Sequence, residues 1–148
     1  MKIIFALLLL STFLTPALPA LAQELQGEKR VIFLKQTPVS CDLISDSLVQ
    51  RFTPSLPEID SADLAVNNHL QDITMANGIN LRGGDYFRQY AGIWWQGQKL
   101  IFINASCRKP DYFMENTYHP KGGGECYFRA LVDINTKKIS RFSFNAPK

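Results

Sequence analysis

The sequence predicts an α+β domain in which an amphipathic helix packs on a four-stranded antiparallel sheet made of two hairpins. The sheet is predicted because residues 86–106 and 126–144 each contain two aromatic and β-branched runs separated by a short polar link. The helix is predicted because residues 56–76 carry apolar side chains at three- and four-residue spacing. A sheet of this size needs a cover over its apolar face, and we expect this helix to supply it.

The first 22 residues have the features of a secretory signal peptide. Lys2 precedes an apolar run at residues 3–14, and Ala20 and Ala22 provide the small residues of a cleavage site. The alternative, an uncleaved membrane anchor, is disfavoured because the run is too short to span a bilayer. We therefore expect cleavage, a single domain at residues 23–148 with no membrane span, and a periplasmic or secreted location.

The charge balance gives no indication of a nucleic-acid or membrane-surface partner. The chain has 16 Lys and Arg against 13 Asp and Glu, a formal net charge of +3, and its basic residues are scattered. Binding to a polyanion usually requires a clustered excess of basic residues.

Three cysteines in an exported chain favour a disulfide over a thiol catalyst or a zinc site. We predict that Cys107 pairs with Cys126, because strand alternation places both side chains toward the same core. The bond would close the connection between the hairpins at its base and leave Cys41 as a buried free thiol. A bond from Cys41 to either of the other cysteines is the alternative.

The segment before the long helix contains two weaker patterns. Residues 23–30 are polar and are expected to be frayed, and the apolar run at residues 31–34 fits either an edge strand or a lead-in beneath the sheet. Residues 40–52 predict a short helix with Cys41 on its buried side, because four apolar residues recur at helical spacing. These are Cys41, Ile44, Leu48 and Phe52.

The long helix has clear start and stop signals. Ser55 and Glu58 have the spacing of a capping box, and Asn77-Gly78 is a good C-terminal stop. Its apolar stripe consists of Ile59, Ala62, Val66, Leu70 and Ile73, and its polar side includes Asp60, Asp63, Asn67, Asn68 and Gln71. His69 lies beside the stripe and is read as a surface or edge residue.

The first hairpin is predicted to turn at Gln96-Gly97, which divides its residues between two faces. One face holds Tyr90, Gly92, Trp94, Ile101, Ile103, Ala105 and Cys107, and the other holds Phe87, Gln89, Ala91, Ile93, Trp95, Leu100, Phe102 and Asn104. Both faces are apolar, so both should be covered. The second cover could be the helix at residues 40–52, the insertion between the hairpins, or a second molecule.

The insertion at residues 108–125 is the expected functional loop, because it is long for a connection between neighbouring strands. It mixes basic with aromatic and Met side chains, the residue types that make adaptable contacts with a protein partner. The candidate binding residues are Arg108, Lys109, Tyr112, Phe113, Met114, Tyr118, His119 and Lys121. The alternative is that Tyr112, Phe113 and Met114 fold back over the second sheet face.

Catalytic and metal signals are weak. Cys107 or Cys126 with His119 is the local combination for a Cys-His hydrolase, and export argues against a free thiol there. Loop carboxylates at positions 111, 115 and 125 have no fixed separation for Ca²⁺ or acid–base chemistry. No spacing is typical of a metal site, and no cofactor is implied.

Several stretches resemble a group of small exported bacterial proteins of uncharacterised function. They are residues 86–92 (YFRQYAG), 101–105 (IFINA), 122–128 (GGGECYF) and 142–145. The resemblance covers roughly the second half of the mature chain and implies a bacterial origin but no mechanism. The order of a helix followed by antiparallel strands is also similar to cystatin-like folds, an analogy that transfers no activity.

We expect a non-enzymatic module that binds a protein partner, such as an inhibitor or immunity-like factor, through the insertion and the adjacent sheet face. One alternative is a small periplasmic hydrolase that uses Cys, His or loop carboxylates. Another is a homodimeric envelope protein whose apolar sheet face is its own interface.

Overall fold

The computed structural model describes residues 22–25, 29–44 and 49–147. The predicted signal peptide, apart from Ala22, lies outside the described residues. The elements in chain order are β1 (Ala22–Leu25), β2 (Arg30–Phe33), β3 (Gln50–Phe52), α1 (Leu56–Asn77), η1 (Gly83–Asp85), β4 (Phe87–Trp95), β5 (Gln98–Ser106), η2 (Gly124–Cys126), β6 (Tyr127–Asp133) and β7 (Lys138–Phe144).

The α+β class is confirmed, but the sheet is mixed and larger than the predicted four antiparallel strands. Its order is β1-β2-β4-β5-β6-β7, and β3 also pairs with β4. Along one edge of β4, β2 runs parallel to residues 88–91 and β3 runs antiparallel to residues 92–94. Strands of three or four residues are too short to show a period in the sequence, which is why β1 and β3 were not predicted and a strand at β2 was only one of two alternatives.

Residues 23–25 were expected to be frayed, but the structure places them in the sheet. With Ala22 they form β1, which pairs antiparallel with β2. The apolar run after it forms β2, an inner strand between β1 and β4 rather than an edge.

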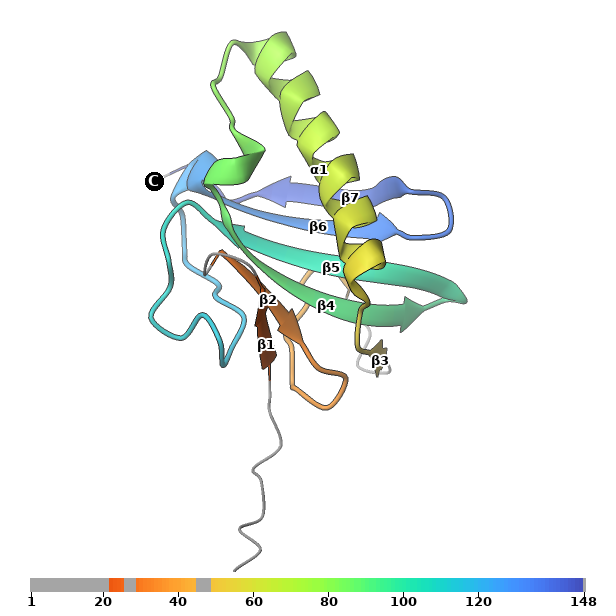
Figure 1. The fold of residues 1–148 in the computed structure, drawn as a ribbon. Coiled ribbons are helices and arrows are strands. Elements are labelled where there is room, and N and C mark those ends of the chain that lie inside the picture. Colours follow the sequence, from red (N-terminus) through yellow and green to blue (C-terminus); the bar gives the residue numbers. More distant parts are fainter. Residues whose placement is uncertain (1–21, 26–28, 45–48, 148) are drawn as a thin grey trace, which may run out of the picture.

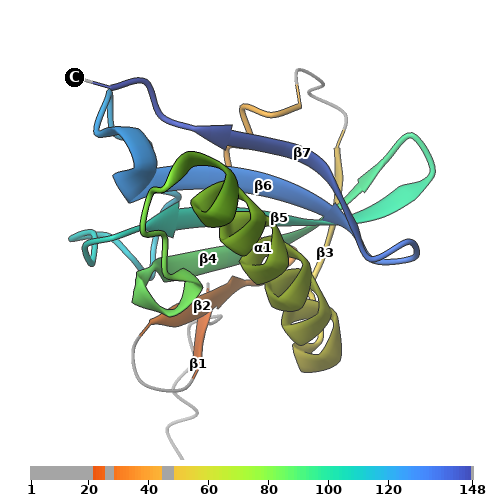
Figure 2. The same cartoon turned by 90° about the horizontal axis from the view of Figure 1, so that it is seen from above.

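Helix α1 is confirmed, and it lies across one face of the sheet (Figures 1 and 2). At its start, the backbone N–H of Ser55 donates to Glu58 Oε2 at 2.8 Å. At its end, Gly78 has a φ of 68° and donates its N–H to the Thr74 carbonyl, a conformation that glycine adopts without strain. Its buried residues are Ile59, Ala62, Val66 and Leu70. Within the described ranges, no helix is long and apolar enough to cross a membrane.

The predicted turn between β4 and β5 is confirmed. Gln96 and Gly97 both have positive φ, 49° and 77°, and Trp95 pairs with Gln98 across the two-residue turn. This register separates the two faces as predicted. The face under α1 includes Tyr90, Ile101, Ile103, Ala105, Phe128, Ala130 and Val132.

The second face is covered by the chain itself, with both the insertion and the segment before β3 contributing. Phe113 and Ile44 are buried there against Val31, Phe33, Ala91, Ile93, Leu100, Phe102 and Leu131. The side of the sheet opposite α1 in Figure 1 is therefore covered by the chain itself at these residues, and the expected partner contact or self-association through a sheet face stays a prediction.

The predicted helix at residues 40–52 is wrong. Its described residues form a turn at 42–43 and the strand β3, and residues 45–48 lie outside the described part. Ile44 packs on the face away from α1, whereas Phe52 packs against the cluster under α1. The apparent helical period combined residues that belong to opposite sides of the sheet.

Candidate functional site

The insertion is held from beneath by two buried amide side chains on neighbouring strands. Gln89 on β4 and Asn104 on β5 are register partners, and the Asn104 Nδ2 donates to Gln89 Oε1 at 2.8 Å. Gln89 Nε2 donates to the carbonyls of Phe113 and Asn116, both at 2.7 Å. Asn104 Nδ2 also donates to the Tyr118 carbonyl, and the Tyr118 N–H donates back to Gln89 Oε1. The irregular backbone of the loop thus has hydrogen-bond partners that strands would otherwise supply.

A third amide holds the end of the insertion. Asn145, which follows β7, donates through Nδ2 to the carbonyls of Pro120 and Gly122 at 2.8 and 3.0 Å. Its Oδ1 accepts from Arg129 of β6 at 3.0 Å. No sequence pattern predicted these three amides as loop supports, although the alternation placed Gln89 and Asn104 on an apolar sheet face, where a buried amide needs a partner.

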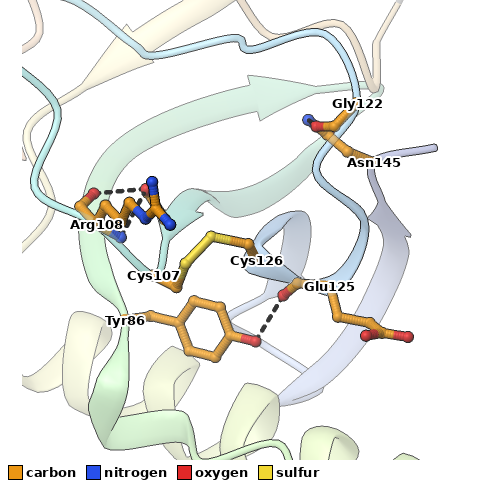
Figure 3. Close-up of a disulfide and its surroundings, with 8 residues drawn as sticks. Tyr86, Cys107, Arg108, Gly122, Glu125, Cys126 and Asn145 are labelled. Atoms are coloured by element: carbon orange, nitrogen blue, oxygen red, sulfur yellow. Dashed lines mark hydrogen bonds between the residues drawn. A yellow bond between two sulfur atoms is a disulfide. The ribbon is translucent and has the colours of Figure 1, made fainter. Parts of the chain in front are cut away.

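The predicted disulfide between Cys107 and Cys126 is confirmed, and it closes the base of the insertion (Figure 3). The Cys107 N–H also donates to the Cys126 carbonyl at 2.8 Å, and the Tyr86 hydroxyl donates to the neighbouring Glu125 carbonyl at 2.7 Å. Cys107 is exposed, so the bond lies at the border of the sheet rather than in the core that the prediction invoked. Cys41 is the free cysteine and is half-buried.

The two aromatic residues and the methionine at positions 112–114 divide between core and surface. The Phe113 ring is buried and packs edge-on against Phe87, with centroids 5.8 Å apart, and Met114 lies half-buried beside the same cluster. Tyr112 points outward and is 65% exposed. Of the three, Phe113 and Met114 follow the fold-back interpretation, and Tyr112 alone remains accessible for contact.

Of the remaining candidate residues, four line two adjoining hollows at this end of the molecule: Arg108, Lys109, Tyr118 and Lys121. The larger, about 370 Å³, is lined by Arg108, Tyr118, Pro120, Lys121, Gly122, Gly123, Cys126 and Tyr127. The smaller, about 200 Å³, shares Arg108, Tyr118 and Tyr127 with it and adds Ser106, Lys109, Pro110 and Asp111. Between the hollows, the rings of Tyr118 and Tyr127 lie 5.8 Å apart. His119 is exposed and contacts the Thr117 hydroxyl at 2.9 Å.

Three ionisable groups, one of which lines the hollows, have a shifted pKa. Desolvation raises the pKa of the Cys41 thiol and lowers that of His119, and desolvation followed by the neighbouring Tyr127 raises that of Tyr118. The proposed Cys-His pairs at this site lack a nucleophile, because Cys107 and Cys126 are bonded to each other. Among the described residues, no three His, Cys, Asp or Glu side chains are placed to hold a metal ion.

A second polar cluster, which the sequence analysis missed, joins α1 to the sheet. Arg88 is only 4% exposed and donates to Asp63 Oδ1 at 2.5 Å, to Asn67 Oδ1 at 2.6 Å and to the Gly83 carbonyl at 2.8 Å. The Tyr90 hydroxyl donates to the same Asp63 carboxylate at 2.9 and 3.0 Å. Desolvation and then Asp63 raise the pKa of Tyr90, so its hydroxyl stays a donor. Asp63 had been assigned to the solvent side of the helix, and the signal for the cluster was a charged residue, Arg88, on the same strand face as Tyr90.

No protein-family model, curated protein or solved structure matches this chain. The resemblance to small exported bacterial proteins therefore stays a prediction.

Proposed function

We propose that this chain is an exported, non-enzymatic module that binds a protein partner through the outer surface of the insertion, residues 108–125. The observation that carries the proposal is that an irregular loop is fixed from three directions while its tip exposes a large aromatic side chain. Gln89 and Asn104 hold its middle, Asn145 holds its end, and the disulfide closes its base.

A loop fixed before binding loses less conformational entropy when a partner docks, which favours affinity. Tyr112 and Tyr118 are exposed by 65% and 40%, and tyrosine is enriched among the residues that dominate binding energy at interfaces. Basic side chains of the same insertion, at positions 108, 109 and 121, line the hollows beside Tyr118. Export is supported by the leader pattern of residues 1–22 and agrees with the disulfide.

Site-specific photo-crosslinking tests the proposal. A benzophenone amino acid placed at position 112 should give a defined protein adduct in bacterial envelope extract after irradiation. The matched control is the same amino acid at Leu64 of α1, which is 63% exposed and lies on the other layer of the fold. The proposal is rejected when position 112 gives no adduct, or when it gives the same adducts as position 64.

The partner identified in this way then permits a quantitative test. Tyr112→Ala should weaken its binding by about 10-fold or more, equivalent to about 1.4 kcal/mol, while the melting temperature stays unchanged because the side chain makes no core contact. Leu64→Ala should leave both binding and melting temperature unchanged.

A further inference from the structure

We infer that the larger hollow beside the disulfide binds an acidic segment of the protein partner, with a carboxylate seated between Arg108 and Lys121. This inference rests on the proposed function, because it names the chemistry of the partner that the insertion would recognise.

The first support is unbalanced charge. The lining of the 370 Å³ hollow contains two cationic side chains, Arg108 and Lys121, and no carboxylate. Among the ion pairs and hydrogen bonds of the described residues, none involves the guanidinium of Arg108 or the ammonium of Lys121. Glu125 directly precedes Cys126 of the disulfide, and its carboxylate points away from Arg108 (Figure 3). A concave surface lined by charges of one sign concentrates ligands of the opposite sign.

The second support is the shape and chemistry of the walls. Tyr118 and Tyr127 offer two ring faces and two hydroxyl groups, and the disulfide at Cys126 and the Gly122-Gly123 backbone complete the surface. Gly123 leaves room for this arrangement, because a Cβ there would lie 2.5 Å from the Tyr127 ring. Planar guanidinium groups bind carboxylates in a bidentate manner, and phenol rings pack against the aliphatic part of a peptide.

The third support is the contrast with the adjoining hollow. The smaller hollow shares Arg108 but adds both Lys109 and Asp111, so its fixed charges are nearer to balance. An acidic side chain would therefore prefer the larger hollow, and a neutral or mixed stretch of the same segment would continue past Tyr118. This gives the segment a direction along the surface.

The test uses purified protein and a peptide of alternating Glu and Tyr residues, with an analogue in which each Glu is Gln. Two-dimensional NMR titration should show that the acidic peptide shifts backbone amide signals around the hollow, at positions 108, 118, 121–123 and 127, and that the Gln analogue binds at least about 10-fold more weakly. Binding should weaken as salt rises from about 50 to about 300 mM, because the contacts lie near the surface.

Paired variants locate the charge dependence. Arg108→Gln with Lys121→Gln should weaken binding by about 5- to 30-fold, the loss expected when two partly exposed ion pairs disappear. The control is Lys137→Gln with Lys138→Gln, which removes the same charge from the end of the β6–β7 turn and the first residue of β7, both exposed, and should change binding by less than about 2-fold. That turn lies at the far end of β6 from Cys126 (Figure 2).

Three results would overturn the inference: equal binding of the Gln analogue, equal losses in the two paired variants, or tighter binding of a single-stranded oligonucleotide in the same hollow. The proposed function fails separately. A crosslinked partner that binds the Arg108→Gln, Lys121→Gln variant as well as wild type rejects the acidic segment but keeps the binding module. Acidic-peptide binding without any crosslinked partner rejects the binding module.

Discussion

Replacing Gln89 with Met should release the insertion from the sheet while leaving the apolar core filled. Gln89 makes four hydrogen bonds: it donates to the carbonyls of Phe113 and Asn116, and it accepts from Asn104 Nδ2 and the Tyr118 N–H. Met has nearly the same length and shape but can replace none of them. Each bond contributes about 1 kcal/mol net, so the variant should lose about 4 kcal/mol if none of the four partner groups finds a replacement and about 2 kcal/mol if water pairs with two of them.

For a domain of this size, about 4 °C of melting temperature corresponds to 1 kcal/mol, so Gln89→Met should melt about 8 to 16 °C below wild type. Hydrogen exchange adds a local readout, because amide protection at residues 113–118 should fall before that of β5 and β6. Glu115→Ala is the matched control, because Glu115 lies in the same loop but its side chain is exposed. It should change the free energy of unfolding by less than about 0.5 kcal/mol. Unchanged melting and unchanged loop protection in Gln89→Met would refute the idea that buried amides hold the insertion.

Three further predictions concern the supports of the fold. Replacing Cys107 and Cys126 together by Ser should lower the free energy of unfolding, measured in urea, by about 3 kcal/mol. The control Cys41→Ser should lower it by less than about 1 kcal/mol, and equal losses would argue against a stabilising role of the disulfide. Arg88→Met should cost about 2 to 4 kcal/mol in the same assay, because it removes the main partner of the Asp63 carboxylate. Adding Asp63→Leu should recover part of this loss, and a double variant less stable than Arg88→Met alone would contradict the reasoning. Burial alone would raise the pKa of Glu58, but hydrogen bonds from Lys99 and Ser55 outweigh it and leave the pKa lowered. The stability from this carboxylate is therefore present above its unfolded pKa of about 4.3 and is lost as pH falls through the lower folded value, so acid should destabilise Glu58→Gln less than wild type in melts between about pH 5 and pH 3.

The elements that the sequence could predict are those whose signal is local and long. Helix α1 has a cap, a stripe of at least four buried residues and a glycine stop, and the β4–β5 hairpin has a two-residue turn that fixes which side chains share a face. The disulfide pairing followed from the same alternation, although its exposed position did not.

The elements that escaped prediction depend on contacts between distant segments. Strand β3 is three residues long and is placed by its pairing with β4, where a Cβ on Gly92 would lie 2.5 Å from the Phe52 carbonyl oxygen. The helical period at residues 40–52 was misleading because tertiary contacts divide its apolar residues between two cores. Likewise, Phe113 and Tyr112 are adjacent and similar in sequence, and only the folded loop separates a core ring from an exposed one.

Three consecutive residues of β4 explain how both layers of the molecule keep their places on the sheet. Apolar burial has little directional preference, so it alone would allow α1 and the insertion to shift along the two sheet faces. Arg88 and Tyr90 point toward α1 and bond to Asp63, whereas Gln89 points the other way and bonds to the insertion. Because a buried polar group must be paired, these bonds form in one register only, and leaving them unmade would be costly on either face. The outward side chains of Tyr112 and Lys121 take no part in these bonds, so they remain available for contact with a partner.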